Sequence, residues 1–258
     1  MYLPIATQQT CATAWLEATT AVNDASGHEA HNVIIDVSAP LTHAASDGAI
    51  VGLVNTLLRK QDVLPVQSVA NTIFPDALYR RYGAPNFMDH FHEKLLPKIR
   101  RTDRWSGYYF ERMTAYPTPA GKPLNQLWGI VERIRDEKNK SLNKFELSLF
   151  DPERDIDNSP YGGQCLSFLS FKLMPGEEKK LMLTALYRNH YYIEKLLGNL
   201  FGLSRLMGFI AQEAGVGVGS LTIISTHAVV DAPKGARRTD ITKLLSDCRA
   251  AQEISEAA

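Results

Sequence analysis

The segment that most constrains the fold of this chain is a long apolar stretch over residues 192–214. Apolar side chains recur in it at intervals of three and four residues, the spacing of residues on one face of an α-helix. These residues are Ile193, Leu196, Leu197, Leu200, Phe201, Leu203, Met207 and Ile210. Because few charged residues interrupt the stretch, a helix formed here has little surface that suits water. The sequence therefore predicts a fully buried helix, around which the rest of the chain has to pack.

Strand-like runs lie on both sides of this predicted helix. The runs FELSLF, CLSFLSFKLM and LMLTALY precede it, and SLTIISTHAVV follows it. Apolar and polar residues alternate in much of these runs, which is typical of strands with one buried face. A turn at Pro175-Gly176-Glu177 joins the second run to the third, and residues 32–37 form an earlier buried strand.

Four further helices are predicted, over residues 7–22, 50–59, 87–99 and 125–137. The stretch punctuated by Pro75, Gly83 and Pro85 and the polar run over residues 136–144 are expected to be loops. Strands with interspersed helices, without a regular strand–helix alternation, favour the α+β class. No segment has the composition of a linker, so we expect a single domain over residues 1–258.

The composition narrows the class of partner. The chain has 258 residues, 45% of them hydrophobic, and its 28 Lys and Arg residues balance 28 Asp and Glu residues. A net charge of zero provides no general attraction for nucleic acid or an anionic membrane, but one or two placed cations suffice for a small anion. The chain has no apolar run of about 20 residues free of charged side chains, no leader-like N-terminus and three scattered cysteines without CxxC spacing. These features predict a cytoplasmic protein without a zinc site.

Three residues carry the strongest chemical signal. Cys165 begins the run CLSFLSFKLM, Arg188 ends LMLTALY, and Asn199 follows 11 residues later in the apolar helix. A thiol, a guanidinium and a carboxamide are the groups needed to attack carbon 6 of a pyrimidine nucleotide, hold its phosphate and bind its base. Each residue also has a plainer interpretation. Cys165 fits a small buried hydrophobe, Arg188 a surface ion pair, and Asn199 the cap of a helix break.

The order of motifs over residues 105–231 resembles the thymidylate synthase superfamily, which includes the pyrimidine hydroxymethylases. The matching segments are Tyr109-Phe110-Glu111-Arg112, Asn125-Gln126-Leu127, Phe150-Asp151-Pro152, Gln164-Cys165, Leu186-Tyr187-Arg188-Asn189 and Asn199. The resemblance implies a thymidylate-synthase-like fold with a mixed sheet, a buried central helix and a homodimer formed through the sheet. The chain is identified on these motifs as a divergent member.

The resemblance also implies roles for these residues. The Cys165 thiolate would add to carbon 6 of a uridine-type 5'-monophosphate, and carbon 5 would then accept a methyl or hydroxymethyl group. Arg188 and its neighbour Asn189 would bind the phosphate, and Asn199 would donate to O4 and accept from N3–H, which suits uracil. Gln164 stands beside the nucleophile, where the family commonly has Pro. Because a free thiol has a pKa of about 8.5, Arg188 is also expected to supply positive charge to Cys165.

Four further residues are candidates for the same site. Tyr109 and Glu111, in the aromatic segment 105–116, could organise water for proton movement at carbon 5. That segment also fits a strand with one wet face. His227 would lie near the substrate, or be a core histidine paired to backbone. Lys144 stands where the family supplies arginines across its dimer interface, and it would reach the partner's site.

The departures from the family pattern cluster in two places. Tyr191 replaces an Asp that contacts the folate, and Glu194-Lys195-Leu196-Leu197-Gly198 replaces the run that packs on it. In the last strand, Val229 and Asp231 replace a His and a Tyr. Methylene-tetrahydrofolate, the cofactor that the resemblance implies, is therefore doubtful. Two alternatives stay open, a folate-independent enzyme that uses the same Cys165 addition and an inactive nucleotide-binding homologue.

A cluster formed by Asp89, His90, His92 and Glu93 is the strongest metal candidate in the sequence. Adjacent residues and residues two apart do not share a helix face, so a solvated surface is the favoured interpretation. No metal is expected.

Overall fold

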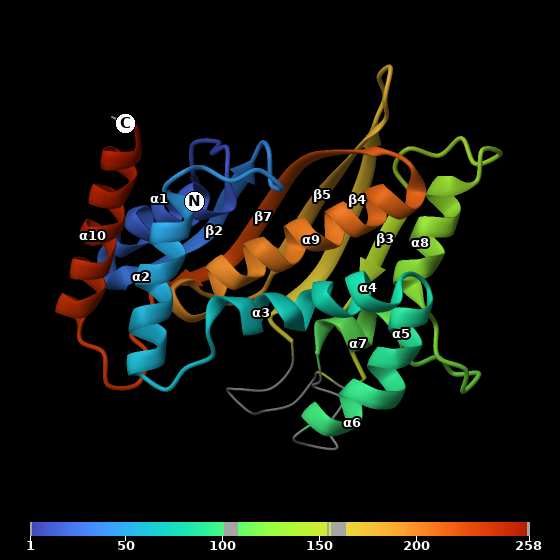
Figure 1. Cartoon of the computed structure of the whole chain (residues 1–258), viewed down its shortest axis with the longest axis horizontal. Helices are drawn as coiled ribbons and strands as arrows, with labels where there is room; N and C mark the ends of the chain where they lie inside the picture. The colour runs from blue at the N-terminus through green and yellow to red at the C-terminus, as the bar shows by residue number, and fades with distance from the viewer. Residues whose placement is uncertain (1, 101–107, 154, 156–163, 257–258) are drawn as a thin grey trace.

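The computed structural model describes residues 2–100, 108–153, 155 and 164–256 (Figure 1). In this part of the chain, seven strands form one sheet in the order β1-β2-β7-β5-β4-β3, and β6 pairs with β7. The strands are β1 (Leu3–Pro4), β2 (Glu29–Val37), β3 (Phe145–Ser148), β4 (Leu166–Met174), β5 (Lys180–Tyr187), β6 (His190–Tyr191) and β7 (Gly217–Val229). Residues 105–107 and 162–163, which the sequence motifs include, lie outside the described residues.

The sheet is mixed. Strands β3, β4 and β5 are successive antiparallel neighbours, β7 runs parallel to β5, and β2 runs antiparallel to β7. Alternate residues of β4 and β5 are buried, as the period of two in the sequence predicts. A mixed sheet combined with helices confirms the α+β prediction.

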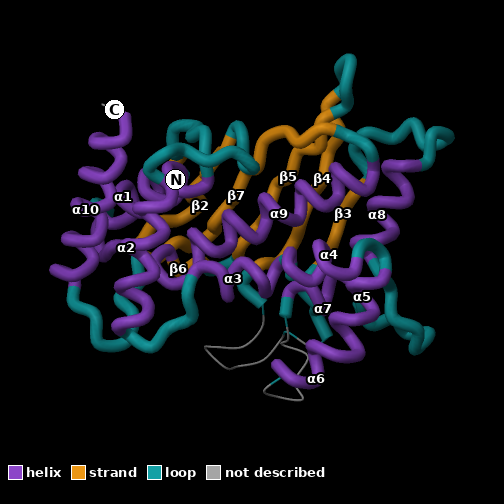
Figure 2. Tube along the Cα trace, in the orientation of Figure 1, coloured by secondary structure: helices purple, strands orange, loops and turns teal. Residues whose placement is uncertain are grey.

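The helices are α1 (Cys11–Asn23), α2 (Asp47–Lys60), α3 (Val66–Ile73), α4 (Asp76–Tyr82), α5 (Asn86–His90), α6 (Leu96–Ile99), α7 (Tyr109–Thr114), α8 (Gln126–Arg135), α9 (Leu197–Ala214) and α10 (Arg238–Glu256). Two π-helical turns, η2 (Phe91–Leu95) and η3 (Tyr192–Leu196), precede α6 and α9, and a short 3-10 turn, η1 (Ser26–His28), precedes β2. In Figures 1 and 2, α9 crosses in front of β5 and β4, and α3 lies beside it.

Helix α9 forms from the apolar stretch that the sequence singles out, and most of its residues are buried. Two glycines let α3 approach it closely. A Cβ at Gly198 would lie 2.5 Å from the Cβ of Val69, and one at Gly202 would lie 2.9 Å from the Ala70 carbonyl oxygen. These distances are shorter than real contacts allow, so a larger side chain at either position would push α3 away from α9.

Capping and local packing decide where several elements begin. Helix α1 starts at Cys11 rather than at residue 7 because the side chains of Thr10 and Thr13 form a reciprocal capping box. Asn125 caps α8 by accepting from the Trp128 N–H at 2.9 Å. The predicted loop around Pro75 is wrong in part, because α3 and α4 lie on either side of that proline.

The buried apolar side chains form a continuous cluster between the helices and one face of the sheet. Trp15 of α1 ties this cluster to η3 by donating its indole N–H to the Tyr192 carbonyl at 2.7 Å. In a second aromatic group, Phe87 packs edge to face on Phe74 and Phe209, and Phe74 and Phe209 are tilted against each other, with ring centroids 5.0–5.8 Å apart. Among the described residues, no helix is both long enough and apolar enough to cross a bilayer.

Candidate active site

A cavity of about 390 Å³ opens where α3, α6 and α7 meet the ends of β4, β6 and α9. This volume lies near the lower end of the range of about 300–1,000 Å³ that is usual for small-molecule sites. The cavity gathers six of the residues that the sequence proposes for the site. They are Tyr109, Glu111, Gln164, Cys165, Asn189 and Asn199.

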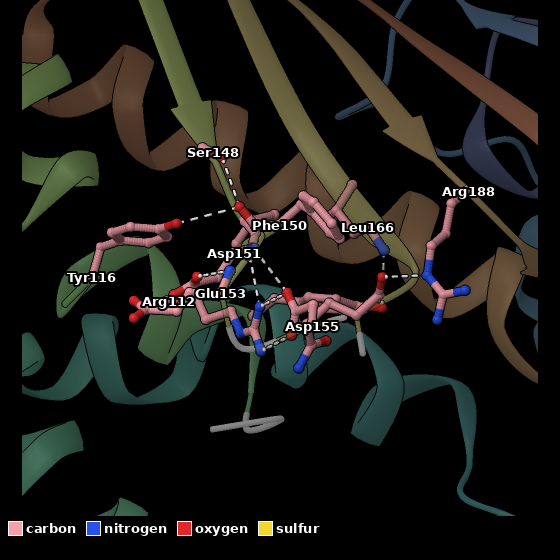
Figure 3. A network of polar contacts seen from close by, with 12 residues as sticks. Arg112, Tyr116, Ser148, Phe150, Asp151, Glu153, Asp155, Leu166 and Arg188 are labelled. Carbon is pink, nitrogen blue, oxygen red and sulfur yellow. Dashed lines mark hydrogen bonds and ion pairs between the residues drawn. The ribbon is translucent and has the colours of Figure 1, made fainter. Parts of the chain in front are cut away.

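The register of β4 and β5 brings Cys165 and Arg188 together. Leu166, at the start of β4, is paired with Tyr187, at the end of β5. The next residues outward are therefore neighbours, and the Arg188 N–H donates to the Cys165 carbonyl at 2.9 Å. The Arg188 side chain also turns back, and its Nε donates to the Gln164 carbonyl at 3.0 Å (Figure 3). Arg188 thus lies beside Cys165 but is not itself among the residues that line the cavity, whereas Gln164, Cys165 and Asn189 are.

Two cations act on the Cys165 thiol. Burial raises the pKa of Cys165 above its ordinary value, while Arg188 first and Lys195 second lower it. Burial is the largest of these influences, so the resting thiol is protonated at neutral pH. Arg188 supplies the positive charge expected from the sequence, but this charge alone does not make a resting thiolate. Lys195 lines the same cavity and was not among the predicted residues.

Asn199 occupies the inner end of the cavity, on the first turn of α9. Its side-chain nitrogen lies 2.9 Å from Nε2 of His190, and Nδ1 of that ring lies 3.0 Å from the Ser225 hydroxyl. Burial lowers the pKa of His190 to about 3, so this ring is neutral. His190 was not among the site residues predicted from the sequence. Its position in the segment after Arg188 was visible, but a contact with a residue nine positions later depends on how β6 meets α9.

Tyr109 and Glu111 enter the cavity from α7, and the alternative that this segment is a strand is wrong. Helix formation here buries Phe110 and Met113, three residues apart, on the core side. The Tyr109 hydroxyl accepts from the Leu166 N–H at 3.4 Å, and burial raises its pKa well above the usual value. Glu111 forms an ion pair with Arg100, and burial nevertheless raises the pKa of its carboxyl group.

Arg112, the last residue of the Tyr109 motif, has a structural role behind the cavity. Its guanidinium is fully buried and forms two bonds to the Asp155 carboxylate, at 2.5 and 2.8 Å (Figure 3). It also donates to the Leu149 carbonyl at 2.7 Å. Asp155 in turn accepts from the Asp151 N–H at 2.9 Å. This network ties α7 to the segment that follows β3.

Gln126, from the second motif, also bonds to backbone. Its amide donates to the Ser148 carbonyl at 2.9 Å and accepts from the Ser148 N–H at 3.1 Å. These two bonds fix the start of α8 against the end of β3. Arg112 and Gln126 therefore both hold elements in place around the cavity.

Besides Arg188, two predicted residues lie outside the cavity lining. His227 is half-buried on β7, with Nδ1 2.9 Å from the Asn189 side-chain oxygen, so it contacts a lining residue through a side chain. Lys144 is exposed just before β3, and its carbonyl accepts from Arg133 at 3.0 Å. Within one copy of the chain, Lys144 belongs to a different surface from the thiol.

The positions that depart from the family pattern lie around the outer part of the cavity. Tyr191, on β6, and Lys195, on η3, both line it. Asp231 accepts the N–H groups of Ile193 at 2.8 Å and Glu194 at 3.3 Å, and so caps η3. Burial raises the pKa of Asp231 to about 6.

The predicted metal candidate is dispersed. His90 stacks on Tyr82 with ring centroids 4.0 Å apart, and Nε2 of His92 lies 2.8 Å from the Thr114 hydroxyl. In the part of the chain that the structure describes, no three His, Cys, Asp or Glu side chains gather closely enough to hold a metal ion.

No protein-family model matches the chain. The curated proteins to which it is similar, however, share one name. The chain is 31% identical over 128 residues to the "putative thymidylate synthase" of Methanocaldococcus jannaschii, covering 48% of this chain and 55% of that protein. Proteins with the same name are 26% identical over 181 residues in Methanothermobacter marburgensis (69% and 74%) and 35% identical over 107 residues in Methanosarcina mazei (42% and 46%). The match to the first and third spans about half the length of these relatives. The chain is thus similar to several proteins that carry this name, and it diverges from them over much of its sequence.

Proposed function

We propose that the protein modifies carbon 5 of a pyrimidine nucleotide, transferring a methyl or hydroxymethyl group to a uridine-type 5'-monophosphate through a covalent Cys165 adduct at carbon 6. The observation that carries this proposal is that Cys165 and Asn199, which are 34 positions apart in the sequence, line the same cavity. A nucleophile and a base-binding amide in one enclosed space are the minimum that this chemistry needs.

Two cations near the thiol suit a phosphorylated substrate. Arg188 lies beside Cys165, and Lys195 lines the cavity. We assign the phosphate to Arg188, together with Asn189, because a guanidinium binds phosphate oxygens strongly. The charge of Lys195 would assist the loss of the thiol proton when the nucleotide is bound.

The proposed reaction begins with addition of the Cys165 sulfur to carbon 6. As the Cys165 sulfur bonds to carbon 6, the thiol loses its proton and the carbon 5–carbon 6 double-bond electrons move toward O4. Carbon 5 then attacks a one-carbon donor, the carbon 5 proton is lost, and the carbon 6–sulfur bond breaks to restore the double bond. Hydroxymethyl transfer from formaldehyde itself needs no further reactant, whereas methyl transfer also needs a reduced cofactor that supplies a hydride, with loss of the donor oxygen as water. Glu111 lines the cavity with a raised pKa, so we propose that it and Tyr109 order the water that carries these protons.

Methylene-tetrahydrofolate fits this cavity poorly. The family's folate-contacting Asp is Tyr191 here, and η3 carries Glu194 and Lys195 in place of the apolar run. An exposed aromatic ring and charged side chains do not reproduce that set of contacts. We therefore derive no step through folate, and we keep as a second candidate an enzyme that uses the same Cys165 addition for a folate-free substitution at carbon 5.

An inactive nucleotide-binding homologue is the third candidate. Its support is that Asp231, which replaces the family's Tyr, is occupied in capping η3. Such a protein would bind the nucleotide without forming an adduct.

We also propose a homodimer formed through the uncovered face of the sheet. A row of half-buried apolar side chains crosses four paired strands on that face, formed by Phe168, Leu186, Ile224 and Ile34. A partner copy would cover this row and could bring its Lys144 toward the cavity. Sedimentation of the protein as a monomer at all concentrations would contradict the dimer.

The experiment that tests the proposed function measures tritium release from dUMP and UMP labelled at carbon 5, with and without methylene-tetrahydrofolate. Release into water requires carbon 5 to be activated by addition at carbon 6. Release without folate favours the folate-free enzyme, and release only with folate favours the transferase. Tight nucleotide binding without any release would favour the inactive homologue, and no binding would contradict all three.

A further inference from the structure

A buried polar chain beside the cavity connects four side chains, one each from η3, β7, β6 and α9. The Tyr192 hydroxyl donates to Ser225 at 3.3 Å, Ser225 lies 3.0 Å from Nδ1 of His190, and Nε2 of His190 lies 2.9 Å from the Asn199 amide nitrogen. All four residues are at most 3% exposed. Buried polar groups at such positions require partners, so the direction of each hydrogen bond is strongly constrained.

The His190 ring cannot easily turn. It stacks on Tyr187 with centroids 3.9 Å apart and planes 10° from parallel, and it contacts Tyr192 edge to face. The ring is neutral, so one of its nitrogens donates and the other accepts. An amide nitrogen only donates, so Nε2 is the acceptor from Asn199. The ring proton is then on Nδ1 and is donated to Ser225.

This arrangement fixes which edge of the Asn199 amide faces the cavity. One N–H of the Asn199 amide donates to His190. The second N–H and Oδ1 are left for a ligand, and their relative positions are fixed because the amide cannot turn over. Uracil presents a donor at N3 and an acceptor at O4, and cytosine presents an acceptor at N3 and a donor at N4. If the two bases bind in the same pose, an amide that cannot turn over forms both hydrogen bonds with one base. With the other base it places donor against donor and acceptor against acceptor.

We infer that His190 is a positioning residue that holds the Asn199 amide in the order required by a uracil-type base, an inference that rests on the proposed function. Turning the amide over would place Oδ1 against the lone pair of Nε2. Accepting cytosine would then require the ring proton to move from Nδ1 to Nε2, with the Ser225 hydroxyl donating to Nδ1. The tautomer of a side chain behind the site is therefore linked to the base that the site accepts.

The first arm of the test needs no nucleotide. Long-range proton–nitrogen NMR spectra of the full chain, labelled with ¹⁵N-histidine, report which ring nitrogen carries the proton, and His190→Phe identifies the His190 signals. We expect a protonated Nδ1 and an unprotonated Nε2 for His190 between about pH 6 and about pH 8. A protonated Nε2 would overturn the assigned amide orientation.

The second arm measures equilibrium binding of dUMP and dCMP. In His190→Phe, which keeps an aromatic ring against Tyr187, the ratio of dUMP to dCMP affinity should fall by about tenfold or more because the amide can turn over. Tyr192→Phe, which removes the outermost bond of the same chain, should leave the ratio unchanged. If both affinities fall by the same factor in His190→Phe, the role is structural and the inference is wrong.

The two arms separate this inference from the proposed function. A wild-type protein that binds neither nucleotide would contradict the proposed function and the base selection together, whatever the tautomer. A wild-type protein that binds both with equal affinity, while Nε2 is unprotonated, would contradict the inference alone.

Discussion

The two walls of the cavity are held in place in different ways. Cys165 and Arg188 stand at the ends of β4 and β5, and the backbone pairing of those strands makes them neighbours. Lys195 stands on η3, which Asp231 anchors by accepting two backbone N–H groups, and Tyr191 stands on the two-residue strand β6 just before it. The first wall keeps the residues that match the family pattern, and the second carries the departures.

The difference indicates how such a site can diverge. A position fixed by strand register keeps its place whatever side chains surround it, because the backbone bonds of the sheet determine it. A position fixed by one carboxylate and a π-helical turn can be rebuilt without disturbing the sheet. We therefore expect the nucleophile end to retain its chemistry while the outer end has acquired another specificity.

The largest expected effect concerns the first wall. Cys165→Ser should reduce turnover by at least about a thousandfold, because a hydroxyl is a far weaker nucleophile than a thiol, while nucleotide binding should persist. Tritium release and calorimetric binding measure the two quantities. Cys248→Ala, which changes a buried thiol on α10, is the matched control and should retain activity. A Cys165→Ser protein with normal turnover would remove the nucleophile from the account.

The next effect concerns the network behind that wall. Arg112→Met leaves the Asp155 carboxylate buried without its partner, so the free energy of unfolding should fall by about 3–5 kcal/mol. Lys243→Ala, in an exposed ion pair with Asp247, should change it by less than about 1 kcal/mol. Urea denaturation of the three proteins measures both differences. Similar losses in the two variants would mean that the buried pair does not hold α7.

A smaller effect is expected from the anchor of the second wall. The pKa of Asp231 is raised to about 6 in the folded protein, so the folded state binds this proton more tightly than the unfolded chain. The contribution of Asp231 to stability is therefore present at low pH and is lost as the pH rises from about 4 to about 6. Asp231→Asn should remove this loss and gain about 2–3 kcal/mol relative to wild type between pH 4 and pH 7.

The change with pH is the quantity to compare, because the substitution also alters the cap itself at every pH. Glu137→Gln, an exposed carboxyl in the loop after α8, serves as the control. Denaturation curves at several pH values give the slopes. Parallel slopes for wild type and Asp231→Asn would show that this carboxyl does not titrate as described.

The smallest expected effect concerns the influence of Arg188 on the reactivity of Cys165, both in the first wall. Arg188→Ala removes the largest influence that lowers the Cys165 pKa, so alkylation of Cys165 by iodoacetamide at pH 7–8 should slow by about 2–5-fold. Cys11 and Cys248 are buried with pKa values raised to about 12, so Cys165 should dominate the reaction. Arg237→Ala, which removes an exposed cation, should leave the rate unchanged. A faster reaction in Arg188→Ala would contradict the assigned influence.

Much of the fold could be predicted because its elements carry simple periods. The apolar stretch that becomes α9 and the runs that become β4, β5 and β7 were expected from spacing alone. The helices α3 and α4 were missed because Pro75 suggested a loop, although a proline between two helices satisfies the same geometry. Tyr109 and Glu111 were placed near the site, but their aromatic surroundings concealed a helix only six residues long.

The residues of the candidate site also fall into two groups, those that could be predicted from the sequence and those that could not. Cys165, Arg188 and Asn199 could be selected from residue type and spacing. Lys195 and His190 could not, because their relevance depends on tertiary contacts between β6, η3 and α9. The protonation state of the Cys165 thiol could not be predicted from the sequence either, because burial raises its pKa by more than the two nearby cations lower it.

The proposed function requires that Cys165 forms a covalent bond to carbon 6 of a uracil nucleotide. Denaturing mass spectrometry of the protein after incubation with 5-fluoro-dUMP or 5-fluoro-UMP tests it directly, beside Cys165→Ser and with or without methylene-tetrahydrofolate. We expect a mass increase of one nucleotide, located on the peptide that contains Cys165 and missing from Cys165→Ser. An unmodified wild-type protein under all four conditions, or an adduct that persists in Cys165→Ser, would contradict it.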